Sequence, residues 1–135
     1  MPMHVGTHID ALCHAWYDDK LYNGYPADSI TAVGSTILGI DHVKTLVGRG
    51  VLLDVARAKG VDHLEGGYPL TPDDLDAAVE QARVEVLPGD IVLIRTGHIQ
   101  RFTLERDRAA FNGTQPGLSP ACAEWVHDHS LAAVC

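Results

Sequence analysis

The sequence lacks any apolar run near the ~18 residues that a membrane-spanning helix needs, so a membrane protein is not expected. It also lacks the basic start and apolar stretch of a secretory signal peptide. Cysteines are few: Cys13, Cys122 and Cys135 are widely spaced, without a Cys-x-x-Cys pair, which is typical of reduced thiols. Positive charge is scarce too, with 10 basic against 18 acidic residues and a net charge of −8, which argues against a nucleic-acid partner. These absences predict a cytoplasmic protein that binds neither membranes nor nucleic acid.

The rest of the composition is that of an ordinary folded domain. Apolar residues make up 46% and charged residues 21% of the chain, so extensive disorder is not expected. Its 135 residues match the length of one domain, and no repeat, low-complexity tract or linker separates a second one. We therefore expect residues 1–135 to belong to a single domain.

Residues 4–14 concentrate the side chains with the clearest chemical meaning. The segment contains His4, His8, Asp10 and His14. Imidazole nitrogens and carboxylate oxygens are the usual ligands of catalytic Zn²⁺ and similar divalent ions, and two histidines with one carboxylate leave a coordination position open for water. The segment therefore predicts a metal-centred hydrolase site.

An extended conformation would collect three of these side chains. Side chains alternate along a strand, so His4, His8 and Asp10 share one face, and Gly6 leaves room between the two histidines. A helix would bring the histidines together but would turn Asp10 away. The glycine and the β-branched residues of this segment also disfavour a helix. We therefore expect a strand with all three ligands on one face.

His14 follows Asp10 by four residues, in a stretch that could begin a helix. One helical turn would place His14 on the same face as Asp10, beside the metal, where it could act as a general base or acid. Cys13 lies in the same stretch, but its neighbours are better ligands. A nucleophilic role for the Cys13 thiol stays open as an alternative.

The same segment resembles the signature of a family of metal-dependent hydrolases often called the cyclase family, which includes bacterial kynurenine formamidases and isatin hydrolases. The family pattern reads His-x-Gly-Thr-His-x-Asp-x-Pro-x-His, and it is matched at His4, Gly6, Thr7, His8, Asp10 and His14. Leu12 departs from it, since many members have proline there. Later segments that look familiar in the same order extend the resemblance over essentially the whole chain: 22–24, 50–55, 87–90, 95–97 and 116–119.

The resemblance implies a role for each motif residue. His4, His8 and Asp10 would ligate the metal, and His14 would be the catalytic acid or base. Zn²⁺ and Mn²⁺ both suit such ligands, and the full-length protein could hold two ions. Family members are longer, with a strand region before the signature and a further histidine and acidic metal ligand after the last helix. The resemblance also implies that the protein is a homodimer. We therefore expect this chain to be an internal fragment of a longer domain, with an incomplete metal site, and we expect the activity of the parent protein rather than of this chain by itself.

Strand and helix signals alternate along the chain. Residues 51–55 and 90–96 are apolar runs typical of buried strands, and the chain ends in a third run at 131–135. Thr71 and Pro72 mark a helix start, with threonine as N-cap and proline at the first helical position. Ser119-Pro120 opens another helix, residues 29–40 are β-rich, and a short helix is expected from residue 39 to 47.

This alternation predicts a mixed α/β domain with a partly parallel sheet and flanking helices. The resemblance implies the swivelling β/β/α form of cyclase-like proteins, here incomplete.

The turn-rich segment after the signature contains Trp16, Tyr17, Tyr22 and Tyr25. These aromatic side chains could form the apolar wall of a substrate pocket or simply pack beneath a long loop, and both interpretations stay open. His98 follows the end of an expected strand, where α/β proteins often place site residues. We therefore name Trp16, Tyr17 and His98 as candidate substrate-binding residues.

The expected reaction is metal-assisted hydrolysis of an amide C–N bond. The metal would lower the pKa of bound water and polarise the substrate carbonyl, and His14 would pass a proton to the leaving amine. By resemblance the substrate would be an aryl formamide such as N-formylkynurenine, an intermediate of tryptophan catabolism, cleaved to kynurenine and formate. A cyclic amide such as isatin, another lactam or a lactone is the alternative within the family. Two alternatives from other classes are an inactive metal-binding domain and a domain whose histidines are incidental.

Overall fold

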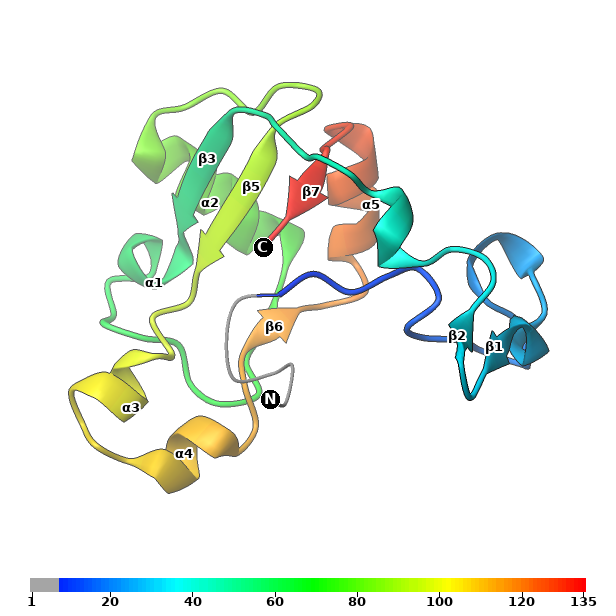
Figure 1. Ribbon diagram of the computed structural model, residues 1–135. Helices are drawn as coiled ribbons and strands as arrows, with labels where there is room; N and C mark the ends of the chain where they lie inside the picture. The colour runs from blue at the N-terminus through cyan, green and yellow to red at the C-terminus, as the bar shows by residue number, and fades with distance from the viewer. Residues whose placement is uncertain (1–7) are drawn as a thin grey trace. The chain divides into compact units, whose positions relative to one another are not determined.

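A computed structural model describes residues 8–135, and the chain divides into two compact units, Met1–Val47 and Gly48–Cys135. In Figure 1 the first unit runs from blue to cyan, and the second runs from green to red. Among the helices of residues 8–135, none has the length and apolarity of a membrane span.

The described part of the first unit consists mostly of turns and short helices. Strands β1 (Ile30–Thr31) and β2 (Gly34–Ser35) form a small antiparallel hairpin. Single turns of 3-10 helix occupy Tyr22–Gly24, Ala27–Ser29 and Ile40–His42. The helix predicted for residues 39–47 therefore ends after one turn, because Val43 already has extended backbone angles and the β-branched residues that follow disfavour a helix.

A parallel three-stranded sheet forms the centre of the second unit. Strand β5 (Ile91–Arg95) lies between β3 (Gly50–Asp54) and β7 (Ala133–Val134), with Gly50 opposite Ile91 and Ile91 opposite Ala133. Each strand coincides with one of the predicted apolar runs. The predicted parallel sheet is therefore confirmed.

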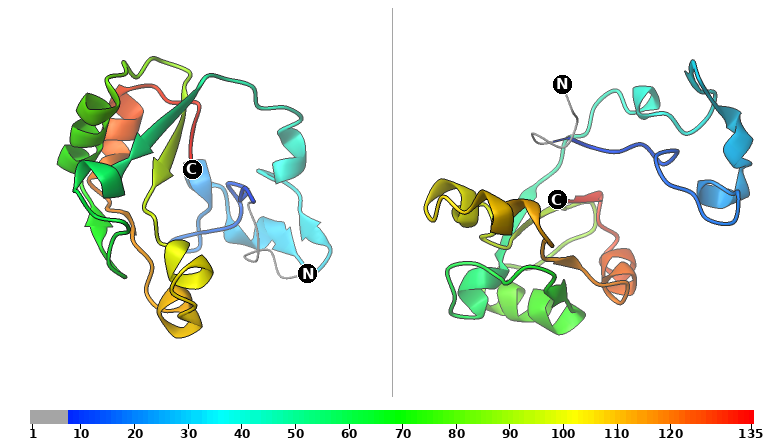
Figure 2. Two further views of the ribbon diagram at one scale, coloured as in Figure 1. Left: turned by 90° about the vertical axis from the view of Figure 1, so that its left-hand side faces the viewer. Right: turned by 90° about the horizontal axis from the view of Figure 1, so that it is seen from below.

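Helices flank this sheet on one side. Helix α1 (Val55–Ala58) follows β3 directly, while α2 (Pro72–Ala82) and α5 (Cys122–Asp128) pack on the same face of the sheet (Figure 2). A second parallel pair, β4 (Pro69–Leu70) with β6 (Gly117–Leu118), and the short helices α3 (Gln100–Thr103) and α4 (Arg108–Asn112) complete the unit. The predicted mixed α/β class with flanking helices is confirmed.

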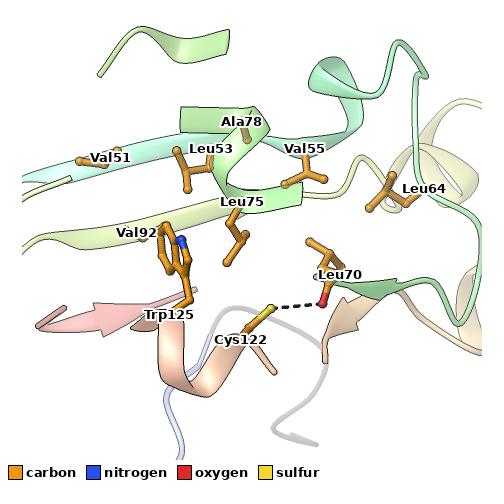
Figure 3. Close-up of a cluster of buried hydrophobic side chains, with 10 residues drawn as sticks. All are labelled: Val51, Leu53, Val55, Leu64, Leu70, Leu75, Ala78, Val92, Cys122 and Trp125. Atoms are coloured by element: carbon orange, nitrogen blue, oxygen red, sulfur yellow. Dashed lines mark hydrogen bonds between the residues drawn. The ribbon is translucent and has the colours of Figure 1, made fainter. Parts of the chain in front are cut away.

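The hydrophobic core lies between the sheet and these helices (Figure 3). Alternate residues of β3 face opposite sides, so Leu53 is fully buried while Leu52 remains 57% exposed. Trp125 and Cys122 reach the core from α5, and the Cys122 Sγ donates a hydrogen bond to the Leu70 carbonyl at 3.2 Å. Helix α2 contributes its buried residues Leu75 and Ala78 to this core.

Helix α2 begins with the predicted cap. Thr71 Oγ1 accepts a hydrogen bond from the Asp74 N–H at 3.3 Å, and an Asp74 carboxylate oxygen accepts one from the Thr71 N–H at 3.0 Å. This reciprocal capping box satisfies two backbone donors that the helix itself leaves unpaired.

Asp74 also joins three segments of the second unit. Lys59 Nζ lies 2.8 Å from one carboxylate oxygen of Asp74, and the Tyr68 hydroxyl donates to the other at 3.0 Å. The hydrogen bond to Asp74 raises the pKa of Lys59 to about 12. Burial opposes the charge of Asp74, but the hydrogen bonds from Lys59, Thr71 and Tyr68 outweigh it and lower the pKa of the Asp74 carboxyl.

Candidate functional site

Two members of the predicted ligand set, His8 and Asp10, face each other in the first unit. The distance from His8 Nε2 to Asp10 Oδ2 is 3.8 Å. Metal–ligand bonds of about 2.0–2.2 Å at a tetrahedral angle separate two ligand atoms by about 3.4 Å. The observed spacing of 3.8 Å is about 0.4 Å wider than this, so it allows a shared divalent ion, which stays a prediction.

The third predicted ligand, His4, lies outside the described residues, as does Gly6 of the motif. Within residues 8–135, no group of three or more His, Cys, Asp or Glu side chains is arranged to hold a metal ion. The described part of the chain thus contributes a pair of donors, and the role of His4 stays a prediction.

The backbone around these donors differs from the prediction. His8, Ile9 and Asp10 belong to no strand, and residues 11–14 form a single turn, closed by a hydrogen bond from the His14 N–H to the Ala11 carbonyl at 2.9 Å. The expectations of a strand through Asp10 and of a helix from Ala11 are therefore wrong for the described residues. Starting a helix is unfavourable, because the first turn orders several residues and gains only one hydrogen bond. Here the chain reaches the β-bridge at Tyr17 before a second turn can add further hydrogen bonds.

Asp10 and His14 nevertheless line the same hollow. This open depression of about 610 Å³ lies wholly within the first unit, and its lining is mainly apolar. Trp16 and Tyr17 also line it, with 56% and 82% of their surfaces exposed. These two side chains are therefore not packed beneath the loop, and their contact with a substrate stays a prediction.

A tight hairpin places a further residue, Lys20, at the hollow. Tyr17 and Lys20 exchange two backbone hydrogen bonds of 3.0 Å, and the residues between them, Asp18 and Asp19, both have positive φ (48° and 57°). Positive φ at both central positions is the signature of a two-residue type I′ turn. Residues directly opposite in such a pair project their side chains to the same face, and both line the hollow.

Lys20 is not among the residues predicted for the site. The available signal was the Asp18-Asp19 pair, because aspartate tolerates positive φ and a two-residue turn brings its flanking residues together. Cys13 is half-buried. Like Cys122 and Cys135, it is a free thiol and forms no disulfide.

His98 belongs to the second unit, where it follows a bend at Gly97, two residues after the end of β5. Gly97 has a φ of +74°, and any side chain there would collide with the backbone at Asp62, so glycine is required at this bend. The His98 ring is buried and stacks on Phe111 with centroids 5.5 Å apart, and His98 Nε2 lies 3.2 Å from the Phe111 carbonyl oxygen. Its predicted contact with substrate stays a prediction.

Asp54 and Arg95 are opposite each other at the carboxyl ends of β3 and β5. Arg95 Nη1 donates to Asp54 Oδ1 at 2.7 Å, and the same oxygen accepts from the Arg57 N–H at 3.0 Å. Burial raises the pKa of the Asp54 carboxyl, but the hydrogen bonds from Arg57 and Arg95 outweigh it and lower the pKa overall. Asp54 thus caps α1 and ties it to the neighbouring strand.

Comparisons with known proteins agree with this architecture. The family described as "Putative cyclase" matches residues 1–135. A solved structure described as that of a novel cyclase superposes with a TM-score of 0.82 at 39% sequence identity, covering 93% of this chain. The chain spans only 43% of the length of that relative. No curated protein matches the chain significantly.

Proposed function

Since the chain belongs to the Cyclase family, we propose that it is part of a metal-dependent hydrolase that cleaves amide C–N bonds. One observation carries the proposal: His8 Nε2 and Asp10 Oδ2 lie 3.8 Å apart beside a hollow that His14 also lines. A pair of metal-type donors next to a titratable imidazole is the arrangement that metal-assisted hydrolysis requires.

His8 and Asp10, with His4 as the third donor, are proposed to hold a Zn²⁺ or Mn²⁺ ion. When bound, such an ion supplies the Lewis acidity that polarises the carbonyl of an amide substrate. The negative charge of Asp10 contributes to cation affinity.

His14 is proposed to move the proton of the reaction. Hydrolysis forms a bond between a water oxygen and the carbonyl carbon and breaks the bond from that carbon to nitrogen. The His14 imidazole takes the proton that the water loses and gives it to the leaving nitrogen, so the ring ends the cycle in its starting state. His14 and Asp10 line the same hollow, which puts both groups within reach of one substrate.

The apolar lining favours an aromatic substrate. Trp16 and Tyr17 offer rings for contact with a flat, apolar ligand. We therefore propose an aryl formamide, cleaved to an aryl amine and formate, as the substrate class. Lactams, which have the same C–N bond, and lactones, in which water attacks the same kind of carbonyl carbon but a C–O bond breaks, serve as competing substrates in the assay.

The test combines elemental analysis with hydrolysis assays on the dialysed full-length protein of which this chain is part. We expect about one Zn or Mn per chain in the wild type and in His127→Ala, whose site in α5 lies in the other unit, and loss of the metal in His8→Ala. Formanilide, isatin and a simple lactone then identify the bond that is cleaved. Metal uptake without hydrolysis of any substrate would leave a metal-binding domain, and absence of metal from the wild type would refute the proposal.

A further inference from the structure

We propose that Lys20 selects substrates with an anionic group, so that the ligand of the hollow is an aromatic compound carrying a carboxylate. This inference rests on the proposed function, because it names the substrate class of the same site. It depends on three observations within the first unit: the position of Lys20, its lack of an ion-pair partner, and the apolar and acidic groups around it.

The type I′ turn holds Lys20 at the hollow. Two backbone hydrogen bonds of 3.0 Å tie Lys20 to Tyr17, and an additional bridge pairs Lys20 with Pro26. The lysine backbone is thus fixed on both sides, and its side chain shares a face with the Tyr17 ring. A cation on such a support loses less freedom on binding a ligand than one on a free loop.

The Lys20 ammonium is not used within the described structure. In residues 8–135, the Lys20 side chain makes no hydrogen bond or ion pair, although the first unit is acidic. Residues 8–47 contain two basic residues, Lys20 and Lys44, against five acidic ones: Asp10, Asp18, Asp19, Asp28 and Asp41. A cation left unpaired in such surroundings is available for an anion from outside the chain.

The neighbours of Lys20 indicate what kind of anion fits. Trp16, Tyr17 and Tyr22 line the same hollow and suit an aromatic ring, while Asp10 and His14 mark the place of the reacting bond. A ligand with a scissile amide near Asp10 and a carboxylate reaching Lys20 satisfies all of these groups. A neutral aryl amide would leave the exposed ammonium hydrogen-bonded to water alone.

The experiment compares two substrates that differ in one charge, formanilide and 2-formamidobenzoate, in wild type, Lys20→Met, Lys20→Arg and Lys44→Met. We expect Lys20→Met to raise KM for the carboxylate substrate about tenfold relative to its effect on formanilide, with kcat little changed. Lys20→Arg should restore most of the preference. Lys44→Met, the matched control outside the hollow, should leave both substrates at wild-type values.

A binding measurement keeps the inference separate from catalysis. Tryptophan emission is followed while benzoate or benzamide is added, and Trp16→Phe identifies Trp16 as the reporter. We expect benzoate to bind more tightly than benzamide in the wild type, and Lys20→Met to abolish that difference. Any bound metal is common to all variants, so the change reports on Lys20 itself.

The outcomes distinguish the two proposals. Lys20-dependent benzoate binding without hydrolysis of either substrate would retain the inference and refute the proposed reaction. Hydrolysis with the same substrate preference in wild type and Lys20→Met, together with equal benzoate binding, would retain the reaction and overturn the inference. Absence of both hydrolysis and a benzoate preference would refute both.

Discussion

Arg49 and Asp90 form a two-pronged ion pair at the amino ends of β3 and β5, although 41 residues separate them in the sequence. Arg49 Nε donates to Asp90 Oδ1 at 2.9 Å, and Arg49 Nη2 donates to Asp90 Oδ2 at 2.6 Å. The Leu87 N–H donates to the same carboxylate at 2.8 Å. The hydrogen bonds from Arg49 and Leu87 lower the pKa of the Asp90 carboxyl from 3.8 to about 2.

We expect Asp90→Asn to lower the thermal midpoint by several degrees at pH 7, because it leaves a guanidinium without its counter-charge and weakens two hydrogen bonds. In the native protein the Asp90 carboxyl has a lower pKa than in the unfolded chain, so it binds its proton only at a lower pH. The unfolded chain therefore binds more protons as the pH falls from about 4 to about 2, and the stabilising contribution of Asp90 is lost over that range.

Circular dichroism melts at pH 7, 4 and 2.5 check this prediction. The difference in thermal midpoint between wild type and Asp90→Asn should narrow as the pH falls, while Asp62→Asn, at an exposed aspartate without this ion pair, should follow the wild type throughout. Equal midpoints for the wild type and Asp90→Asn at pH 7 would contradict it.

Replacing the N-cap of α2 tests the capping box. Thr71→Ala removes the oxygen that accepts from the Asp74 N–H, and we expect it to cost about 1 kcal/mol of unfolding free energy. Thr103→Ala is the matched control, because its hydroxyl bonds only to the Ile99 carbonyl of its own exposed helix; we expect a change within about 0.5 kcal/mol. Urea denaturation measures both, and equal costs would show that the cap is not the stabilising feature.

Two adjacent leucines of β3 should respond very differently to truncation. Leu53 is fully buried, so Leu53→Ala should cost about 2–5 kcal/mol through lost apolar burial and the cavity left behind. Leu52 is more than half exposed, and Leu52→Ala should cost less than about 1 kcal/mol. Urea denaturation, analysed with the same dependence of unfolding free energy on urea concentration for both variants, provides the comparison. Similar losses of unfolding free energy would contradict the observed alternation of buried and exposed residues in β3.

The role of His14 is separable from metal binding. If His14 moves the proton, His14→Ala should reduce hydrolysis of an aryl formamide by about 100-fold or more, while the metal content of the purified protein stays at the wild-type level. His127→Ala serves as a control for loss of a histidine from the other unit. Loss of metal in His14→Ala would instead make His14 a ligand.

Much of the second unit could be predicted from the sequence because its signals are local. Threonine, proline and two acidic residues in a row determine where α2 begins, since each acts on backbone groups within one turn. The apolar runs at 51–55 and 90–96 similarly identify β3 and β5, because continuous apolar runs are typical of strands in parallel sheets.

The candidate site was predictable in its residue types but not in its geometry. The spacing of His8, Asp10 and His14 predicts metal-type donors and an acid or base, and the structure places His8 beside Asp10 and places Asp10 and His14 in the lining of one hollow. The strand and helix expected around them are wrong for the described residues, because residues 8–14 form one turn and belong to no strand, so this short segment lacks the length to stabilise either element. The same loop positions Lys20, which no motif indicates.

The sequence by itself determined the class of the fold, the start of α2 and the apolar strands, because each depends on residues close together in the chain. Only the tertiary structure decided that Arg49 meets Asp90, that β4 pairs with β6, and that Cys122 is buried against Leu70. These contacts join residues about 40 to 50 positions apart. They form only when the free energy gained by packing offsets the entropy lost in closing such long loops, and no local sequence pattern predicts whether it does.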